Sequence, residues 1–173
     1  MFATLLVPNF YLQAALRHAP ELCNKAVALL DDQEAKAIII QVNDCAAAAG
    51  VGCGMAPSQG LARCLSLVVR TRDRLQERLL AEIVLQCAFT LSPDVEATAS
   101  GVWTIRFTDT RRIDENVTRV IAMLNAMGIT ARAGIAHTLD ASLLAAHMAK
   151  PVLKLGDTKT FLASLPLGVL ASG

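Results

Sequence analysis

The chain has 173 residues, of which 54% are hydrophobic and 18% charged, and its formal net charge is +1. This length suffices for a packed domain that carries a smaller lobe, whereas the near-neutral charge predicts weak nucleic-acid binding by the chain alone, because each phosphate contact requires a lysine or arginine. The apolar runs are too short for a membrane span and no basic residue precedes the apolar N-terminal stretch, so the composition argues against a signal peptide and favours a cytoplasmic protein.

The first part of the chain predicts short elements separated by turn residues. An apolar run broken by Pro8 predicts a buried strand over residues 4–7, and a helix is expected over residues 10–18. Two apolar runs separated by charged residues predict a hairpin. The further elements expected here are strands at 26–30 and 37–42, a helix at 45–49 capped by Asn43-Asp44, a helical turn at 58–64 and a strand at 65–71.

Longer elements follow from residue 73. Apolar residues at helical spacing predict one amphipathic helix over 73–89 and another from residue 113, closed by Gly128. The remaining elements are strands at 94–98, 102–108 and 129–137, and a helix that runs from Thr138 or Asp140 to about Lys150. Without an insert at 9–66, this order contains the β-α-β-β-α-β plan of a ferredoxin-like fold. We therefore predict an α/β (α+β) protein in which a small α/β subdomain is inserted into a ferredoxin-like domain.

Four blocks of sequence carry a more specific signal. They are FYLQAALRHAPEL with KAVALL, AAAAGVGCGMAPSQGLARCLSLVV, LSPDVEATA, and GITARAGIAHTLDASLLAAHMAKP. In this order they resemble the palm and fingers of Y-family (DinB/UmuC-like) translesion DNA polymerases. The resemblance implies a palm over 1–8 and 67–157, fingers over 9–66, and a truncated start of a helical thumb over 158–173.

The resemblance also implies where metal-binding carboxylates should stand. Family members hold two divalent metal ions with an Asp in the first strand and an Asp-Glu pair after the Ser-Pro-x-Val-Glu stretch, because Mg²⁺ prefers oxygen ligands. A gapless match places Leu6, Gly101 and Val102 at these three positions. We therefore expect no metal site, no cofactor and no catalytic residue, and a repair accessory protein that does not transfer nucleotides.

Two alternatives stay open on the sequence. One is an active Y-family polymerase with displaced ligands, which would require Mg²⁺. Against it, Glu96 matches a non-ligand position, Asp94 is expected on the opposite side of its strand, and Asp109 is expected to cap the helix that starts near Ile113. The second alternative is a ferredoxin-like binding module of unrelated function.

Two residues match nucleotide contacts of the family. Tyr11 matches the aromatic residue that gates the sugar 2′ position, and Lys150 matches a palm lysine that reaches the phosphates. Each also has a structural interpretation: Tyr11 as an aromatic packed inside the fold, and Lys150 as an exposed charge at a helix C-terminus.

The densest basic cluster is a candidate DNA contact. Its members are Arg63, Arg70, Arg72, Arg74 and Arg78. The alternative is a solvated helix face on which these arginines pair with Asp73, Glu77 and Glu82.

The pattern of replaced carboxylates resembles the catalytically inactive ImuB-type branch most. That branch opens with an aliphatic-Pro strand, lacks the Asp-Glu pair and carries a FLxxLPLxxL segment like residues 161–170. The likeness implies a pseudoenzyme of bacterial SOS mutagenesis, associated with the nucleoid. Its partners would be DNA, a replicative-type error-prone polymerase, an accessory mutagenesis protein and the sliding clamp, mostly through C-terminal regions absent here.

Cysteine and histidine spacing predicts no zinc site. The five cysteines are odd in number and form no Cys-x-x-Cys pair, and the three histidines are scattered. We expect free thiols in a reducing compartment.

Overall fold

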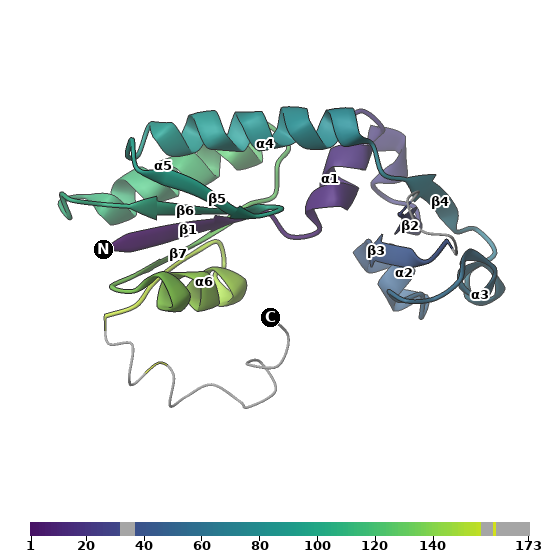
Figure 1. Cartoon of the computed structure of the whole chain (residues 1–173). Helices are drawn as coiled ribbons and strands as arrows, with labels where there is room; N and C mark the ends of the chain where they lie inside the picture. The colour runs from purple at the N-terminus through teal and green to yellow at the C-terminus, as the bar shows by residue number, and fades with distance from the viewer. Residues whose placement is uncertain (32–36, 157–160, 162–173) are drawn as a thin grey trace. The chain divides into compact units, whose positions relative to one another are not determined.

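The computed structural model describes residues 1–31, 37–156 and 161. The chain divides into two compact units, a larger one formed by Met1–Pro8 with Leu85–Gly173 and a smaller one formed by Asn9–Val84. Both units are visible in Figure 1. No helix in the described part of the chain is long and apolar enough to cross a membrane.

The larger unit is built on a five-stranded sheet whose strand order is β5-β6-β1-β7-β8. Its strands are β1 (Phe2–Leu6), β5 (Val95–Ala99), β6 (Val102–Arg106), β7 (Arg132–Ala136) and β8 (Val152–Lys154). The central strand β1 pairs antiparallel with β6 and β7, and β8 pairs parallel with β7. Because β1 has neighbours on both sides, its residues from Ala3 onward are buried, and four of its five residues are apolar, Thr4 being the exception.

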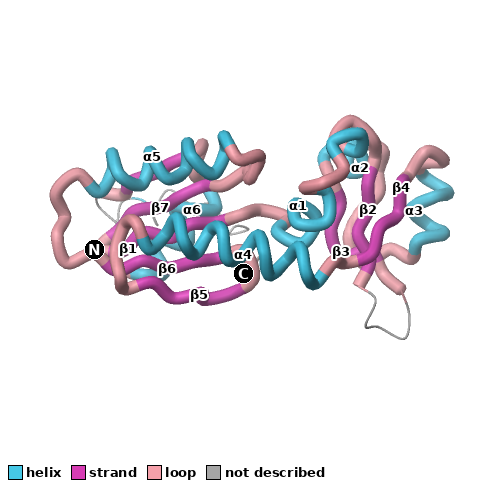
Figure 2. The backbone as a smooth tube through the Cα atoms, turned by 90° about the horizontal axis from the view of Figure 1, so that it is seen from above, coloured by secondary structure: helices cyan, strands magenta, loops and turns pink. Residues whose placement is uncertain are grey.

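Two helices of the larger unit lie on opposite faces of this sheet (Figures 1 and 2). They are α5 (Ile113–Ala126) and α6 (Leu139–Met148). Helix α6 packs directly on β7 because position 134 is a glycine. A Cβ at Gly134 would lie 2.1 Å from the carbonyl oxygen of Ser142, so no other residue fits this approach.

The smaller unit is built on a three-stranded sheet in the order β3-β2-β4. Its elements are α1 (Phe10–Leu16), the 3-10 helix η1 (Pro20–Leu22), β2 (Val27–Leu30), β3 (Ile39–Val42), α2 (Asp44–Ala48), α3 (Pro57–Arg63) and β4 (Val68–Thr71). Successive residues of β2 enter two different apolar clusters, Ala28 with Ile39 and Ala46, and Leu29 with Leu12. Both faces of this sheet are therefore covered.

A long helix, α4 (Arg74–Phe89), begins in the smaller unit and ends in the larger one. Its first turn is capped by the carboxylate of Asp73, which accepts hydrogen bonds from the backbone N–H groups of Leu75 (3.1 Å) and Gln76 (3.0 Å). The predicted start of this helix near residue 73 is confirmed.

The structure confirms the predicted α+β class, since β1, α4, β5, β6, α5 and β7 follow one another in the β-α-β-β-α-β order once residues 9–71 are set aside. Strand β4 pairs parallel with β2 in the smaller sheet, whereas the expected palm range began at residue 67. The boundary of the smaller unit lies at Val84, so it differs from the expected boundary at residue 66. The reason is that parallel pairing joins residues about forty positions apart, which local pattern does not reveal.

Two further details differ from the sequence expectations. Strand β8 was not predicted, because three residues after Pro151 carry too little periodicity. Asp109 does not cap α5, whose N-cap is Arg112. The expected thumb segment, residues 158–173, lies outside the described residues except for Phe161.

Candidate functional site

The three positions that match metal ligands meet at one end of the five-stranded sheet. Leu6 on β1 is directly paired with Val102 on β6, and the backbone N–H of Val7 donates to the carbonyl of Gly101 at 2.8 Å. Directly paired residues on neighbouring strands point to the same face of a sheet. The structure thus brings together positions almost one hundred residues apart in sequence, and they present two aliphatic side chains; Leu6 is 8% exposed.

The backbone conformation at position 101 disfavours a residue with a side chain. Gly101 lies in the turn between β5 and β6 with φ = 80°, a left-handed conformation that L-residues with a side chain adopt at a cost of about 1–2 kcal/mol. An aspartate at this position would therefore be strained.

Acidic residues of the larger unit are engaged elsewhere or lie further along the sheet. Asp94 accepts a hydrogen bond from Arg106 Nε. Asp109 accepts hydrogen bonds from Arg111 Nε (3.1 Å) and Nη2 (2.8 Å), and these bonds lower the pKa of Asp109 to about 2. Glu96 is paired in register with Thr104, two residues along β6 from Val102. Among the described residues, no group of three or more His, Cys, Asp or Glu side chains could hold a metal ion.

Tyr11 lies on α1 of the smaller unit, with its ring covered by Arg72. The guanidinium carbon of Arg72 is 3.6 Å from the centroid of the Tyr11 ring, which is a cation–π contact. The Phe10 ring meets Tyr11 edge-on, with 5.6 Å between the centroids. Tyr11 is half-buried, so the aromatic predicted as a sugar gate is also a packing residue of this unit.

Arg72 is held by two carboxylates. Its Nε and Nη2 donate to the two oxygens of Glu77 at 2.8 and 2.7 Å, and its Nη1 donates to Asp31 Oδ2 at 3.2 Å. Hydrogen bonding to Glu77 is the main cause that raises the pKa of Arg72. Glu77 is 8% exposed, so this pair is shielded from water and differs from the solvated helix face considered on the sequence.

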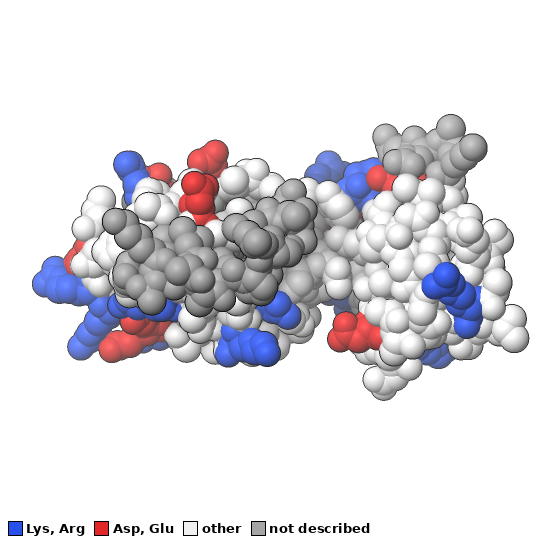
Figure 3. All heavy atoms as spheres, turned by 90° about the horizontal axis from the view of Figure 1, so that it is seen from below, with Lys and Arg blue, Asp and Glu red and all other residues white. Residues whose placement is uncertain are grey.

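The other arginines of the predicted DNA-contact cluster have different surroundings. Arg74 Nη2 pairs with Asp31 Oδ1 at 3.3 Å, and Arg63 Nη1 donates to the carbonyl of Gly50. Arg70 and Arg78 are exposed. The cluster is therefore not one continuous basic surface. On the face of the molecule drawn in Figure 3, basic and acidic side chains are interspersed.

Lys150 follows Ala149, the C-cap of α6, and is exposed. It belongs to the larger unit and Tyr11 to the smaller one, so the two matched nucleotide contacts lie in different compact units.

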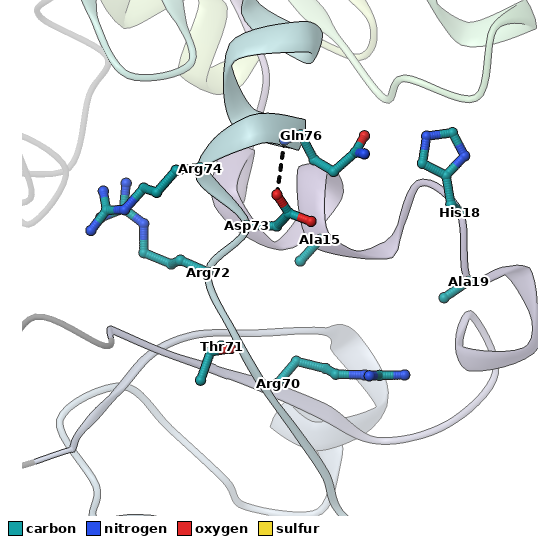
Figure 4. A pocket seen from close by; sticks show the side chains of 9 residues that line it. All are labelled: Ala15, His18, Ala19, Arg70, Thr71, Arg72, Asp73, Arg74 and Gln76. Carbon is teal, nitrogen blue, oxygen red and sulfur yellow. Dashed lines mark hydrogen bonds between the residues drawn. The ribbon is translucent and has the colours of Figure 1, made fainter.

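A hollow of about 450 Å³ opens within the smaller unit (Figure 4). Its walls come from the end of α1, the end of β4 and the first turn of α4, with His18, Arg70 and Gln76 among the lining residues. The size is within the range of small-molecule sites. Sequence reasoning did not find this hollow, because residues from three separate segments form it.

The sequence profile of the impB/mucB/samB family matches residues 5–147. The chain belongs to this family. No curated protein matches it by sequence comparison.

Solved structures similar to this member of the impB/mucB/samB family are Y-family polymerases. DinB from Sulfolobus solfataricus matches with a TM-score of 0.86 at 14% identity, over 99% of this chain and 53% of that chain. An insertion ternary complex of Dbh DNA polymerase matches with a TM-score of 0.85 at 14% identity, over 99% of this chain and 54% of that chain. The chain thus spans about half the length of these polymerases, and at this identity the likeness establishes the fold.

The impB/mucB/samB chain therefore has the palm-and-fingers fold that the sequence predicted. We call the larger unit the palm unit and the smaller one the fingers unit. The sequence analysis did not predict that Glu77 and Asp31 both bind Arg72. The short spacing between Arg72 and Glu77 could have indicated an ion pair, whereas Asp31 lies 41 residues from Arg72 and no local pattern connects the two.

Proposed function

We propose that this chain is a polymerase-like accessory factor of DNA repair and translesion synthesis that does not transfer nucleotides. The observation that carries the proposal is the pairing of Leu6 with Val102, next to Gly101, at the end of β1 and β6. Two-metal nucleotidyl transfer requires carboxylate oxygens that clamp both ions, and aliphatic side chains offer no ligand atom.

The surroundings of this pair favour the same proposal. The carboxylates of Asp94 and Asp109 do not supply ligands to this pair: they are bonded to Arg106 and Arg111, and Arg106 is paired with Phe2 at the opposite end of β1 from Leu6. The strained conformation that any side chain would adopt at position 101 adds a further cost.

The partners follow from the ImuB-type likeness and are part of the proposal. They are DNA, bound weakly by this chain, a replicative-type error-prone polymerase, an accessory mutagenesis protein and the sliding clamp, in the bacterial cytoplasm. A weak DNA contact agrees with the net charge of +1 and with the engagement of Arg72 and Arg74 by internal carboxylates.

An active polymerase with displaced ligands is the alternative. Glu96 is the observation in its favour, because its register with Thr104 places it on the same sheet face as Leu6 and Val102. One carboxylate supplies too few oxygens for two ions, so we favour the inactive assignment.

Metal binding tests the proposal more directly than polymerisation, since the chain spans half of its solved relatives. Mn²⁺ is titrated into the labelled chain, and paramagnetic broadening of backbone amide signals is measured. We expect no selective broadening at Leu6, Val102 and Glu96. Selective broadening there at micromolar Mn²⁺, or extension of a primer in an assay where Dbh DNA polymerase is the positive control, would establish the active alternative instead.

A further inference from the structure

The ring of Tyr11 is enclosed by other groups of the fingers unit. The guanidinium carbon of Arg72 lies over the ring, 3.6 Å from its centroid, and the Phe10 ring meets it edge-on. The Tyr11 side chain also packs against an apolar cluster, which consists of Leu12, Leu22, Val27 and Leu29. A second flat group cannot stack on the ring face that Arg72 already covers.

The backbone around Arg72 determines where its side chain begins. The N–H group of Arg72 donates to the carbonyl of Leu30 at 3.2 Å, so Arg72 extends the parallel pairing of β4 with β2 by one residue. Helix α4 begins two residues later and carries Glu77 in its first turn. Regular elements therefore fix the positions of both Arg72 and its partner Glu77.

Three charge-assisted hydrogen bonds hold the guanidinium of Arg72 over the ring. Two of them join it to the carboxylate of Glu77 at 2.8 and 2.7 Å, and the third joins it to Asp31 at 3.2 Å. The side chains of Arg72 and Glu77 are only 10% and 9% exposed, so water competes poorly for these bonds. Displacement of Arg72 would leave the shielded carboxylate of Glu77 with its longer contact to Arg74, at 3.8 Å. The stacked position is therefore the stable one.

We propose that Arg72 blocks Tyr11 from nucleotides, so that the fingers unit carries a barrier to nucleotide use that is separate from the loss of metal ligands in the palm unit. The inference deepens the proposed function and rests on it, because Tyr11 is the residue that the family resemblance matches to a nucleotide contact. A sugar or base that stacks on Tyr11 would compete for the ring face under the guanidinium. It would have to displace a group that two carboxylates hold in place.

Tyr11 is the only tyrosine of the chain, so its ring signals report on this place alone. The full chain is isotopically labelled at tyrosine, and relaxation enhancement of the ring protons by a soluble gadolinium chelate measures how exposed the ring is. We expect Arg72→Ala to raise this enhancement about twofold or more, because a long side chain that covers the ring is removed. The uncharged probe 2′-deoxyadenosine, at millimolar concentration, should then shift the ring signals at least about threefold more in Arg72→Ala than in the native chain, because stacking becomes possible.

Two further variants make the test specific. Arg72→Ala combined with Glu77→Gln removes both charges of the shielded pair, so it exposes the ring without leaving a carboxylate there unpaired. This double variant replaces Arg72→Ala if the single variant does not fold, as judged by circular dichroism. Arg78→Ala is the matched control: it removes an exposed arginine from the same helix and should leave the enhancement at its native value.

The proposal is overturned if a folded variant without Arg72 keeps the native relaxation enhancement. It is also overturned if 2′-deoxyadenosine shifts the Tyr11 signals equally in the native chain and in that variant. Neither measurement involves a metal ion or a primer. An open Tyr11 ring in a chain that binds no Mn²⁺ would therefore remove this inference alone, whereas selective Mn²⁺ broadening at Leu6 and Val102 would remove the proposed function.

Discussion

At the scale of single residues, the side chains of Leu6 and Val102 decide whether a metal ion can bind at the end of β1 and β6. Their pairing across β1 and β6 is ordinary antiparallel geometry, and any residue at these positions would meet its partner in the same way. Strand pairing therefore determines that the two positions are adjacent, whereas the side chains determine whether a metal ion can bind. For two carboxylates outside this site, Asp109 and Glu77, neighbouring arginines determine the pKa or the contribution to stability.

Asp109 gives a pH-dependent prediction. Because Arg111 donates to it, the pKa of Asp109 is lowered to about 2 from an ordinary value of about 3.9. Ionised Asp109 thus stabilises the folded chain above the unfolded pKa, and this contribution is lost as the pH falls through the folded pKa of about 2. We expect carboxyl carbon NMR signals to report this low midpoint, and Arg111→Gln to return it toward the ordinary value. A midpoint that the substitution leaves unchanged would contradict the assigned cause.

Glu77 gives a prediction about stability. The side chains of Glu77 and Arg72 are only 9% and 10% exposed, so replacing Glu77 with Gln leaves a shielded guanidinium with Asp31 as its remaining carboxylate partner. We expect the free energy of unfolding in urea to fall by about 2 to 3 kcal/mol. Glu115→Gln is the matched control, because Glu115 pairs with Arg112 on the surface at 3.8 Å, and it should change stability by less than about 0.5 kcal/mol. Similar losses in both variants would show that shielding is unimportant.

At the scale of elements, the contact of α6 with the sheet depends on one position. Gly134 on β7 faces the backbone of α6, and a Cβ there would lie 2.1 Å from Ser142 O and 2.2 Å from Ala146 N. The hydrogen bond between Thr4 Oγ1 and Ser142 Oγ, at 2.7 Å, joins α6 to β1 in the same buried layer. The helix therefore packs closely over the centre of the palm sheet.

Gly134→Ala should disrupt this layer. Both clashing groups are backbone atoms, so relief requires a shift of the whole helix, and we expect a loss of about 3 kcal/mol or more in the free energy of unfolding. Gly156→Ala serves as control, since a Cβ at Gly156 meets nothing within 4 Å. Equal stability of Gly134→Ala and the native chain would contradict the close approach of α6 to β7.

For the whole molecule, the important feature is its division into two compact units, each with its own sheet and apolar clusters. The fingers unit follows β1 in the chain and includes the first part of α4, so β1 pairs with β6 and β7 only across the inserted residues. Separate cores predict that damage to one unit is felt mainly within that unit.

Hydrogen exchange can test this independence. Leu29 is fully buried in the fingers unit and Ile135 in the palm unit, and replacement of either by Ala should cost about 2 to 5 kcal/mol of local stability. We expect Leu29→Ala to accelerate amide exchange in β2, β3 and β4 while β1, β6 and β7 keep their protection, and Ile135→Ala to do the reverse. Uniform acceleration throughout the chain in both variants would show one cooperative unit instead.

Much of the fold could be predicted from the sequence because the relevant signals are local. Apolar periodicity identified α4 and α5, the Asn43 cap identified α2, and the strands predicted at 94–98 and 102–108 correspond to β5 and β6. Motif order also predicted the family to which the chain belongs and the palm-and-fingers fold.

Three features were decided only by the tertiary structure. The sheet to which β4 belongs, the shielding of Arg72 by Asp31 and Glu77, and the hollow around Arg70 and His18 each depend on residues that are distant in sequence. The periodicity of a sequence predicts the face of a helix or strand on which a side chain lies. It does not predict which distant residue that side chain contacts, because that depends on how separate segments pack together. The sequence alone predicted that Leu6, Gly101 and Val102 take the places of metal ligands, whereas the pairing of β1 with β6 determined that these residues lie together.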